Sequence, residues 1–441
     1  MGVRVIQTDR PLDDPEVAAV RDRLRGGELT ADGETADLDV KAIVASILAD
    51  VEARGDEAVI DWERKLDRVE LTAGALRVPP ERIAAAHGEA DGDFLALVRR
   101  VAANVRAYQQ SILLADPPPL RRGGRTLGVR YTPVDRVGVY VPGARALYPS
   151  TVLMTIVPAQ VAGVREIAMA SPPTSDGNVD PMVLALAGEL GVSEVYRLGG
   201  AVALGALAFG TESVRPVEKI VGPGNAFVAE AKRQVIGRVG IDCIAGPSEV
   251  LIIADETARP EWVAADLLSQ AEHDPGSAVL VTPSAALAEA VRAAMEEQLR
   301  SLARAAATAR ALEQNSAIIV VGNLDAACDV ANDFATEHLQ IITADDDAVL
   351  AKVRHAGAIF VGPCTPVALG DYYAGPSHVL PTGGTARFFG PLSCNDFRKP
   401  SSVVRYDAAA LDEDGRDVMD FAAREGLTAH AQSIRIRRNK S

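Results

Sequence analysis

From Val137 onward, the chain alternates short apolar runs with longer segments of helical periodicity, and this alternation limits the folds open to it. Each apolar run is bounded by Gly, Pro or Asp, as is typical of parallel strands that are buried on both faces. Repeated alternation of strand and helix favours doubly wound sheets with helices on either side. The runs lie at 137–141, 166–170, 194–198, 218–222, 250–254, 278–282, 317–321, 340–344 and 358–362. Because these nine strands exceed one comfortable sheet, we expect two α/β units.

The segments before and after this region show helical periodicity instead. It extends over 41–67 and 81–112, and again from about Asp407 to the end of the chain. Together the patterns predict an α/β fold with two doubly wound, incomplete Rossmann-like domains and small helical extensions at both ends. We expect the following division: an extension over 1–34, a first domain from 35–138 and 248–390, a second domain over 139–247, and a helical tail over 391–441.

The charge balance of the chain argues against two classes of partner. Of the 441 residues, 45 are Lys or Arg and 60 are Asp or Glu, so the net charge is −15. Such a chain lacks the basic surface that nucleic acid requires, and anionic membranes would also repel it. No charge lies between Arg145 and Arg165, but Pro149 and Pro158 interrupt this stretch, which favours a buried helix over a membrane span.

The cysteine pattern and the amino terminus indicate a cytoplasmic protein. Four scattered cysteines are too few for a disulfide framework in a chain of this length, and no CxxC pair occurs among them. The amino-terminal segment has no long apolar stretch and carries acidic residues early, so it does not read as a signal peptide.

The usual phosphate-binding motifs, GxGxxG and GxxxxGK[ST], do not occur in the sequence. The nearest substitute is Gly222-Pro-Gly-Asn225, which leads into an amphipathic helical segment at 225–237. Free N–H groups at the start of a helix can hold an anion such as a pyrophosphate. An ordinary strand-to-helix turn with Asn225 as the helix N-cap explains the same residues, and the motif by itself favours that simpler interpretation.

Four of the six histidines lie beside carboxylate or amide side chains. These groups are Gln270 with His273, Glu337 with His338, Asp371 with His378, and Glu425 with His430. Gln270 and His273 are three residues apart at the end of a helical segment, so both side chains leave the same face. Imidazole, carboxylate and amide oxygen suit zinc or a similar divalent cation. Spacing alone leaves a metal site and ordinary structural histidines both open.

The chain resembles the histidinol dehydrogenase family over about residues 35–435, because seven segments occur in the order typical of that family. These segments are VGVYVPG, KIVGPGNAFVAEAK, AGPSEVLIIAD, LLSQAEHDP, NDFATEHLQI, GDYYAGPSHVLPTGG and EGLTAH. The resemblance implies a homodimeric enzyme of histidine biosynthesis. Such an enzyme oxidises L-histidinol to L-histidine via L-histidinal, in two NAD⁺-dependent steps at one Zn²⁺ site.

The resemblance also implies roles for individual residues. By correspondence the Zn²⁺ ligands would be Gln270, His273, Asp371 and His430. His338 would be the general base that removes the alcohol proton, and Glu337 would activate water in the aldehyde step. The first domain would carry most of the zinc site.

The remaining implied contacts involve the substrate, the cofactor and a second subunit. The substrate would meet the metal ligands and His338, and in addition Ser248, His378 and Glu425. Tyr140 and Asn225 match positions near the nicotinamide cofactor, in the second domain. The carboxy-terminal tail of the family crosses to the partner subunit. By this resemblance, His430 and Glu425 would complete the active site of the other chain.

One position departs from the family pattern, and two alternatives remain open. Val202, in GGAVALGALAFG, stands where the family usually has Gln, so one hydrogen bond to NAD, worth about 0.5–1.5 kcal/mol, would be missing. The first alternative is a paralogous zinc and NAD dehydrogenase of another small polyol or a sulfonated diol. The second is a catalytically inactive metal-binding scaffold. A sulfonate would require Arg or Lys near the site, and a scaffold has no need of Glu337 and His338.

Overall fold

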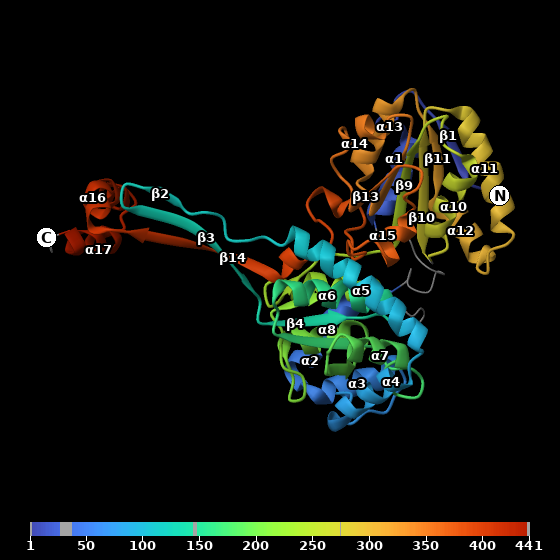
Figure 1. Cartoon of the computed structure of the whole chain (residues 1–441). Helices are drawn as coiled ribbons and strands as arrows, with labels where there is room; N and C mark the ends of the chain where they lie inside the picture. Colours follow the sequence, from blue (N-terminus) through green and yellow to red (C-terminus); the bar gives the residue numbers. More distant parts are fainter. Residues whose placement is uncertain (1, 27–37, 144–147, 274, 439–441) are drawn as a thin grey trace.

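The apolar runs form two separate parallel sheets in the computed structural model, which describes residues 2–26, 38–143, 148–273 and 275–438. The six-stranded sheet has the order β1-β11-β10-β9-β12-β13. Its strands are β1 (Arg4–Gln7), β9 (Ser248–Ala254), β10 (Gly276–Thr282), β11 (Ala317–Val320), β12 (His338–Ile342) and β13 (Ala358–Val361). All of its strand pairs are parallel. This sheet and its helices form the upper domain in Figure 1.

Helices cover both faces of the six-stranded sheet, as buried parallel strands require. Successive residues of β9 belong to different hydrophobic clusters, Val250 and Ile252 on one face and Leu251 and Ile253 on the other. The first face packs on α10 (Pro260–Ala271), α11 (Ala285–Leu299) and α12 (Ala305–Asn315). The second packs on α1 (Pro15–Gly26), α13 (Leu324–Phe334) and α14 (Asp346–Leu350). The short helix α15 (Val367–Tyr372) follows β13.

The five-stranded sheet, in the order β6-β5-β4-β7-β8, forms the second domain. Its strands, all parallel, are β4 (Arg136–Tyr140), β5 (Glu166–Ser171), β6 (Glu194–Arg197), β7 (Lys219–Val221) and β8 (Gly240–Ile241). One face is covered by α4 (Pro80–Glu89), α5 (Gly92–Ile112), α6 (Pro149–Ala162) and α7 (Pro181–Glu189). The other is covered by α2 (Val40–Arg54), α3 (Asp56–Leu66), α8 (Gly200–Phe209) and α9 (Ala226–Val235).

Helix α6 accounts for most of the uncharged stretch of the sequence. Ten of its residues are buried, and it packs in the core of the five-stranded domain, so the expected buried helix is confirmed. Among the described residues, no helix combines the length and the apolar character needed to cross a membrane.

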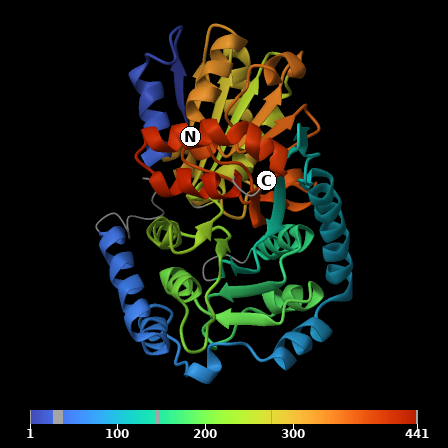
Figure 2. The same cartoon turned by 90° about the vertical axis from the view of Figure 1, so that its left-hand side faces the viewer.

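A long arm projects from the two domains and ends near the carboxy terminus (Figure 1), and in Figure 2 the red end of this arm faces the viewer. Its sheet is antiparallel, with β14 (Arg398–Tyr406) paired to β3 (Arg125–Pro133) and β3 paired to β2 (Leu120–Arg122). The helices α16 (Ala408–Arg424) and α17 (Thr428–Arg438) pack on each other at its tip. Short 3₁₀ turns complete the chain at Ala73–Ala75, Thr385–Arg387 and Cys394–Phe397.

The structure confirms the α/β fold with two parallel-sheet domains and corrects the expected division of the chain. The described part of the expected amino-terminal extension supplies β1 and α1 to the six-stranded domain, since β1 pairs with β11. Residues 40–112 pack on the five-stranded domain rather than on the six-stranded one. The expected helical tail over 391–441 contains a 3₁₀ turn and the strand β14 before α16 and α17.

A buried carboxylate in the five-stranded domain gives a pH-dependent prediction for stability. Glu63 in α3 is fully buried, and its Oε1 accepts the N–H of Gly199 at 2.9 Å. Burial, together with the nearby charge of Asp67, raises the pKa of Glu63 well above its ordinary value. Because the folded chain holds this proton more tightly than the unfolded chain, the resulting stability is present at low pH. It is lost as the pH rises toward the folded-state pKa.

Glu63→Gln is therefore expected to change how stability depends on pH. Glutamine keeps the neutral shape and can still accept the Gly199 N–H. The variant should unfold near the native temperature at about pH 4.5, the ordinary pKa, and at a higher temperature than the native chain in mildly alkaline buffer. Thermal unfolding followed by circular dichroism across this range measures the difference. Parallel curves for the two proteins would contradict the assignment.

Candidate active site

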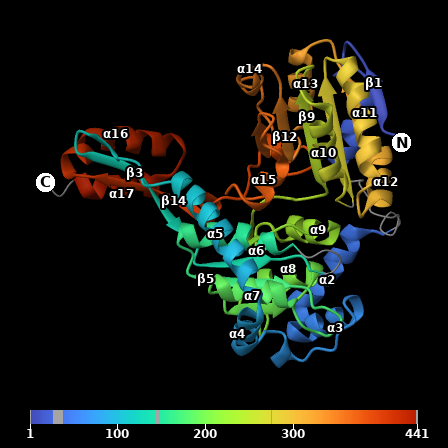
Figure 3. The ribbon, with the colours of Figure 1, turned by 45° about the vertical axis from the view of Figure 1, so that its right-hand side comes forward.

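The predicted catalytic pair lies at the end of the six-stranded sheet where its parallel strands begin. Strand β12 begins at His338, two residues earlier than the apolar run indicated, and Glu337 immediately precedes it. In the sheet, His338 pairs with Val250 of β9 and with Ala358 of β13. Only six residues separate β8 of the five-stranded sheet from β9, so this end faces the second domain. The pair therefore lies at the boundary between the domains, whose arrangement Figure 3 shows.

The ring of His338 is held between a backbone carbonyl and two carboxylates. Its Nδ1 lies 3.0 Å from the carbonyl oxygen of Glu249 and 3.5 Å from Oε2 of Glu337. Its Nε2 lies 3.4 Å from Oδ1 of Asp371. Because a carbonyl oxygen only accepts, a proton on Nδ1 fits this arrangement, and in the neutral ring Nε2 is then the basic nitrogen.

Burial and mutual charge raise the pKa of both members of the pair above their ordinary values. Burial disfavours the charged ring of His338, but the carboxylates of Glu337 and Asp371 outweigh it and raise the pKa of His338 to about 9. Burial raises the pKa of Glu337 to about 7, against the opposing charge of His338. Buried acid–base pairs with shifted pKa values are typical of functional sites, which makes this pair a candidate for proton transfer.

Gln270 and His273 lie at the end of α10, next to the first residue of β10. The N–H of His273 donates to the carbonyl of Gln270 at 3.2 Å, and Nδ1 of His273 lies 3.5 Å from Oγ of Ser248. A Cβ atom on Gly276 would lie 2.1 Å from the Gln270 carbonyl oxygen, so only glycine allows this close approach. The side-chain Oε1 of Gln270 is buried and has no hydrogen-bond partner.

Asp371 and His378 connect the site to the second domain. Asp371 lies in α15, where burial opposes its charge but the hydrogen bond and charge of His338 lower the pKa of Asp371 overall. After α15 the chain crosses onto the five-stranded domain, where Nε2 of His378 lies 2.9 Å from Oγ of Ser150 in α6. Burial lowers the pKa of His378 and that of His273, so both rings are neutral near pH 7.

The structure brings part of the expected metal-binding set together. An unpartnered amide oxygen on Gln270, a neutral imidazole on His273 and an ionised carboxylate on Asp371 are suitable donors for zinc. His430 and Glu425 are exposed and lie at the tip of the arm, away from these three residues (Figure 1). In the described part of the chain, no three His, Cys, Asp or Glu residues form a metal-binding cluster. A single chain therefore offers a set that fits zinc but is incomplete.

The expected cofactor residues lie at the carboxyl ends of β4 and β7. Between these two strands the order of the five-stranded sheet reverses, which is where open α/β sheets bind their ligands. Gly222 follows β7 with φ of 119°, and a Cβ atom there would lie 2.1 Å from the carbonyl oxygen of Tyr140. Asn225 caps α9, its Oδ1 accepting the N–H groups of Phe227 and Val228 at 3.1 Å. The strand-to-helix turn expected from the motif is thus confirmed.

Two positions near this turn are more buried than a cofactor contact suggests. Tyr140 is buried, and its hydroxyl accepts the N–H of Gly200 at 3.1 Å. Val202 is also buried, and it belongs to the hydrophobic cluster that joins α8 to α2. The valine at this position is therefore part of the core of the domain.

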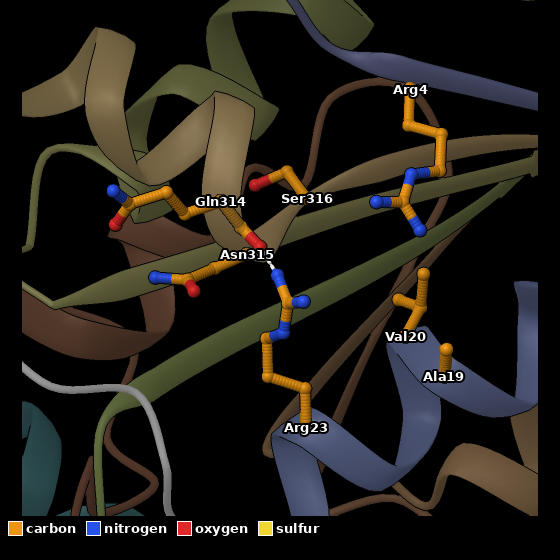
Figure 4. A pocket seen from close by; sticks show the side chains of 7 residues that line it. All are labelled: Arg4, Ala19, Val20, Arg23, Gln314, Asn315 and Ser316. Carbon is orange, nitrogen blue, oxygen red and sulfur yellow. Dashed lines mark hydrogen bonds between the residues drawn. The ribbon is translucent and has the colours of Figure 1, made fainter.

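A hollow on the six-stranded domain, away from the predicted site residues, is too small to be a binding site. Its volume is about 10 Å³, which is room for about one water molecule. Arg23 crosses it and donates to the carbonyl of Gln314 (Figure 4). The residues that line it are Arg4, Ala19, Val20, Arg23, Gln314, Asn315 and Ser316.

The sequence interpretation missed Glu249, which is buried beside the predicted catalytic pair. Its exposure is 1%, and burial raises the pKa of Glu249 to about 8. A carboxylate directly before the apolar run of β9 was the signal that could have indicated it, because an acid rarely lies in a fully buried strand without a bound partner.

Two parallel α/β domains that meet at a buried histidine and carboxylate site define a two-domain enzyme equipped for proton transfer. A family model described as histidinol dehydrogenase matches residues 31–438. The chain belongs to the histidinol dehydrogenase family, so the predicted family and the prediction of a dehydrogenase are confirmed.

Individual relatives agree with this assignment over nearly the full length. The chain is 48% identical over 430 residues to histidinol dehydrogenase of Rhodopirellula baltica, covering 96% of this chain and 94% of the relative. It is 48% identical over 421 residues to that of Geobacillus kaustophilus, covering 95% and 99%. The crystal structure of histidinol dehydrogenase from Elizabethkingia anophelis matches with a TM-score of 0.88 at 32% identity, covering 98% of both chains.

Proposed function

We propose that this protein oxidises L-histidinol to L-histidine through L-histidinal, with two NAD⁺ and one Zn²⁺ per site, in the last steps of histidine biosynthesis. The observation that carries the proposal is the buried contact of His338 with Glu337 and Asp371 at the domain boundary. The compartment we propose is the cytoplasm, in agreement with four cysteines that are all unpaired.

His338 serves the alcohol step in this proposal. Oxidation of the alcohol removes a hydride from carbon and a proton from oxygen, and the hydride goes to NAD⁺. In the neutral ring, Nε2 of His338 takes the proton, since Nδ1 is held by the carbonyl of Glu249. The share of neutral rings rises as the pH approaches the His338 pKa of about 9. The nearby carboxylate of Asp371 stabilises the imidazolium that forms.

Glu337 serves the aldehyde step. Water must add to the aldehyde carbon before a second hydride can leave to a second NAD⁺, and the added water must lose a proton. The pKa of Glu337, raised by burial to about 7, suits a base that accepts a proton near neutral pH. Glu337 and His338 lie at a strand end rather than within a strand, so both can serve one substrate carbon.

The substrate is held by the remaining site residues. Gln270, His273 and Asp371 of one chain, with His430 of the partner subunit, are the residues that would bind zinc. A bound zinc ion would hold the imidazole and amino nitrogens of the substrate. The further substrate contacts proposed are Ser248, His378 and Glu425, and a carboxylate such as Glu425 favours a cationic amino alcohol. The cofactor is proposed to bind near Tyr140 and Asn225.

The arm supports a homodimer in which the active sites are shared. Val404 of β14 and Phe421 of α16 are each 67% exposed, although both are apolar. The helices α16 and α17 bury few residues against each other, so the arm has no core of its own. An element of this kind is stabilised when it packs on a second copy of the chain, and exchange of identical elements is a common route to closed dimers.

Counting NADH against substrate tests the proposed function. The metal-replete protein should form two NADH for each L-histidinol consumed, with L-histidine as product. Chelation should abolish turnover, and Zn²⁺ or Mn²⁺ should restore it, because the metal holds the substrate. One NADH for each histidinol would contradict the four-electron reaction. Full activity after removal of metal would contradict the zinc site, and turnover of a different diol alone would favour the paralogous activity.

A further inference from the structure

Glu249, the second residue of β9, holds two backbone N–H groups near the proposed catalytic pair. Its Oε2 accepts the N–H of Glu337 at 3.4 Å. Its Oε1 accepts the N–H of Gly383 at 2.7 Å, in the segment that follows His378. The side chain therefore links β9 to the turn before β12 and to the segment that crosses between the domains.

The backbone of Glu249 makes the reverse contacts. Its N–H donates to Oε2 of Glu337 at 3.0 Å, and its carbonyl oxygen lies 3.0 Å from Nδ1 of His338. Glu249 and Glu337 thus each hold the backbone N–H of the other residue. Among the residues that the structure describes, Glu249 alone has hydrogen-bond contacts of its backbone with both proposed catalytic side chains, and its own side chain holds the turn that carries them.

We propose that Glu249 is a positioning residue, which fixes the turn at Glu337 so that the carboxylate of Glu337 stays directed at the reacting carbon. This inference rests on the roles proposed above for Glu337 and His338. A carboxylate suits the task because its two oxygens accept two N–H groups that approach from different segments. His338 is held in addition by the ladder of the sheet, so loss of the Glu249 side chain should disturb Glu337 more than His338.

Asp255 provides a matched control in the same pair of strands. It follows the carboxyl end of β9, is nearly as buried as Glu249, and its Oδ2 accepts the N–H of Ala344 beyond the end of β12 at 2.8 Å. Its Oδ1 accepts the N–H of Thr257 at 3.0 Å. Asp255 therefore joins β9 and β12 in the same way as Glu249, but at the end away from the site.

The experiment compares the two half-reactions in Glu249→Gln, Asp255→Asn and Glu337→Gln. The glutamine keeps the size of the side chain and can still accept the Gly383 N–H, but it turns a donor toward the N–H of Glu337. In the metal-replete protein, kcat for histidinal oxidation should fall on the order of 10–100-fold more than kcat for histidinol oxidation, because small misplacements of a reacting group have effects of this size. The KM for histidinol should change little.

The ratio of the two kcat values decides between positioning and mere structural support. The proposal holds if Glu249→Gln shifts this ratio in the same direction as Glu337→Gln, while Asp255→Asn lowers the unfolding temperature and leaves the ratio native. The proposal is overturned if Glu249→Gln keeps the native ratio of the two kcat values, whether or not both steps become slower. Glu249→Asp, which keeps the carboxyl group but shortens the reach, gives the same comparison if the glutamine variant does not fold. If the roles proposed for Glu337 and His338 are wrong, Glu337→Gln would keep the native ratio of the two kcat values, or the native protein would not oxidise histidinol. Both results are independent of Glu249.

Discussion

Replacing His338 with alanine is expected to lower the rate of histidinol oxidation by roughly 10²–10⁴-fold, the usual effect of removing a general acid–base group. The reason is that Nε2 of His338 is the atom proposed to take the alcohol proton. Nε2 lies 3.4 Å from Oδ1 of Asp371, whereas Nδ1 is held by a backbone carbonyl. Oxidation of histidinal supplied directly should fall less, since the alcohol proton is already gone. Stopped-flow measurement of NADH formation from each substrate separates the two steps.

Glu337→Gln provides the complementary measurement. The amide keeps the shape of the side chain and can still accept the N–H of Glu249, but it cannot take a proton from water. Histidinal oxidation should fall by roughly 10²–10⁴-fold, and histidinol oxidation should be affected less. If Glu337→Gln instead abolished the alcohol step and oxidised histidinal normally, the two roles would have to be exchanged.

Nine of the eleven strands in the two parallel sheets were predictable, because burial makes these strands nearly continuously apolar. The two-residue strand β8 was missed. All nine predicted runs form strands. Strand β12 begins at His338, two residues before its predicted apolar run, because the polar residues Glu337 and His338 interrupt the apolar pattern there. The arm could not be predicted in this way. Its strand β14 is exposed and polar along most of its length, since it has no partner layer within the chain. The edge strand β1 is only four residues long, too short to stand out from its surroundings.

The assignment of helices to domains depended on contacts that the sequence does not encode locally. Helix α4 packs on α7, and α5 on α6, so that the segment before β4 covers the five-stranded sheet. Imidazole and carboxylate side chains, together with the family resemblance, indicated the candidate site, and the roles of its residues remain predictions. Glu249 was missed since its role arises from the register of β9 against β12, which only the folded sheet defines.

A mixed dimer of two inactive variants is expected to recover about half of the native activity per dimer, because each proposed active site takes residues from both chains. One chain would carry His338→Ala and the other His430→Ala, and each homodimer should be inactive. If sites are shared, one site of the mixed dimer carries both substitutions and the other carries neither. Co-expression with two different affinity tags isolates the mixed species, and NADH formation measures its activity.

The position of the arm is the reason to expect recovery. His430 lies in α17 at the tip of the arm, whereas Asp371 lies in α15 on the six-stranded domain, and Figures 1 and 3 show these helices on separate parts of the molecule. A tail that served its own chain would leave each site of the mixed dimer with one substitution, and the mixture would stay inactive. An inactive mixed dimer of confirmed assembly would therefore contradict the exchange. It would require the arm to fold back onto its own domain, against the extended course of β3 and β14.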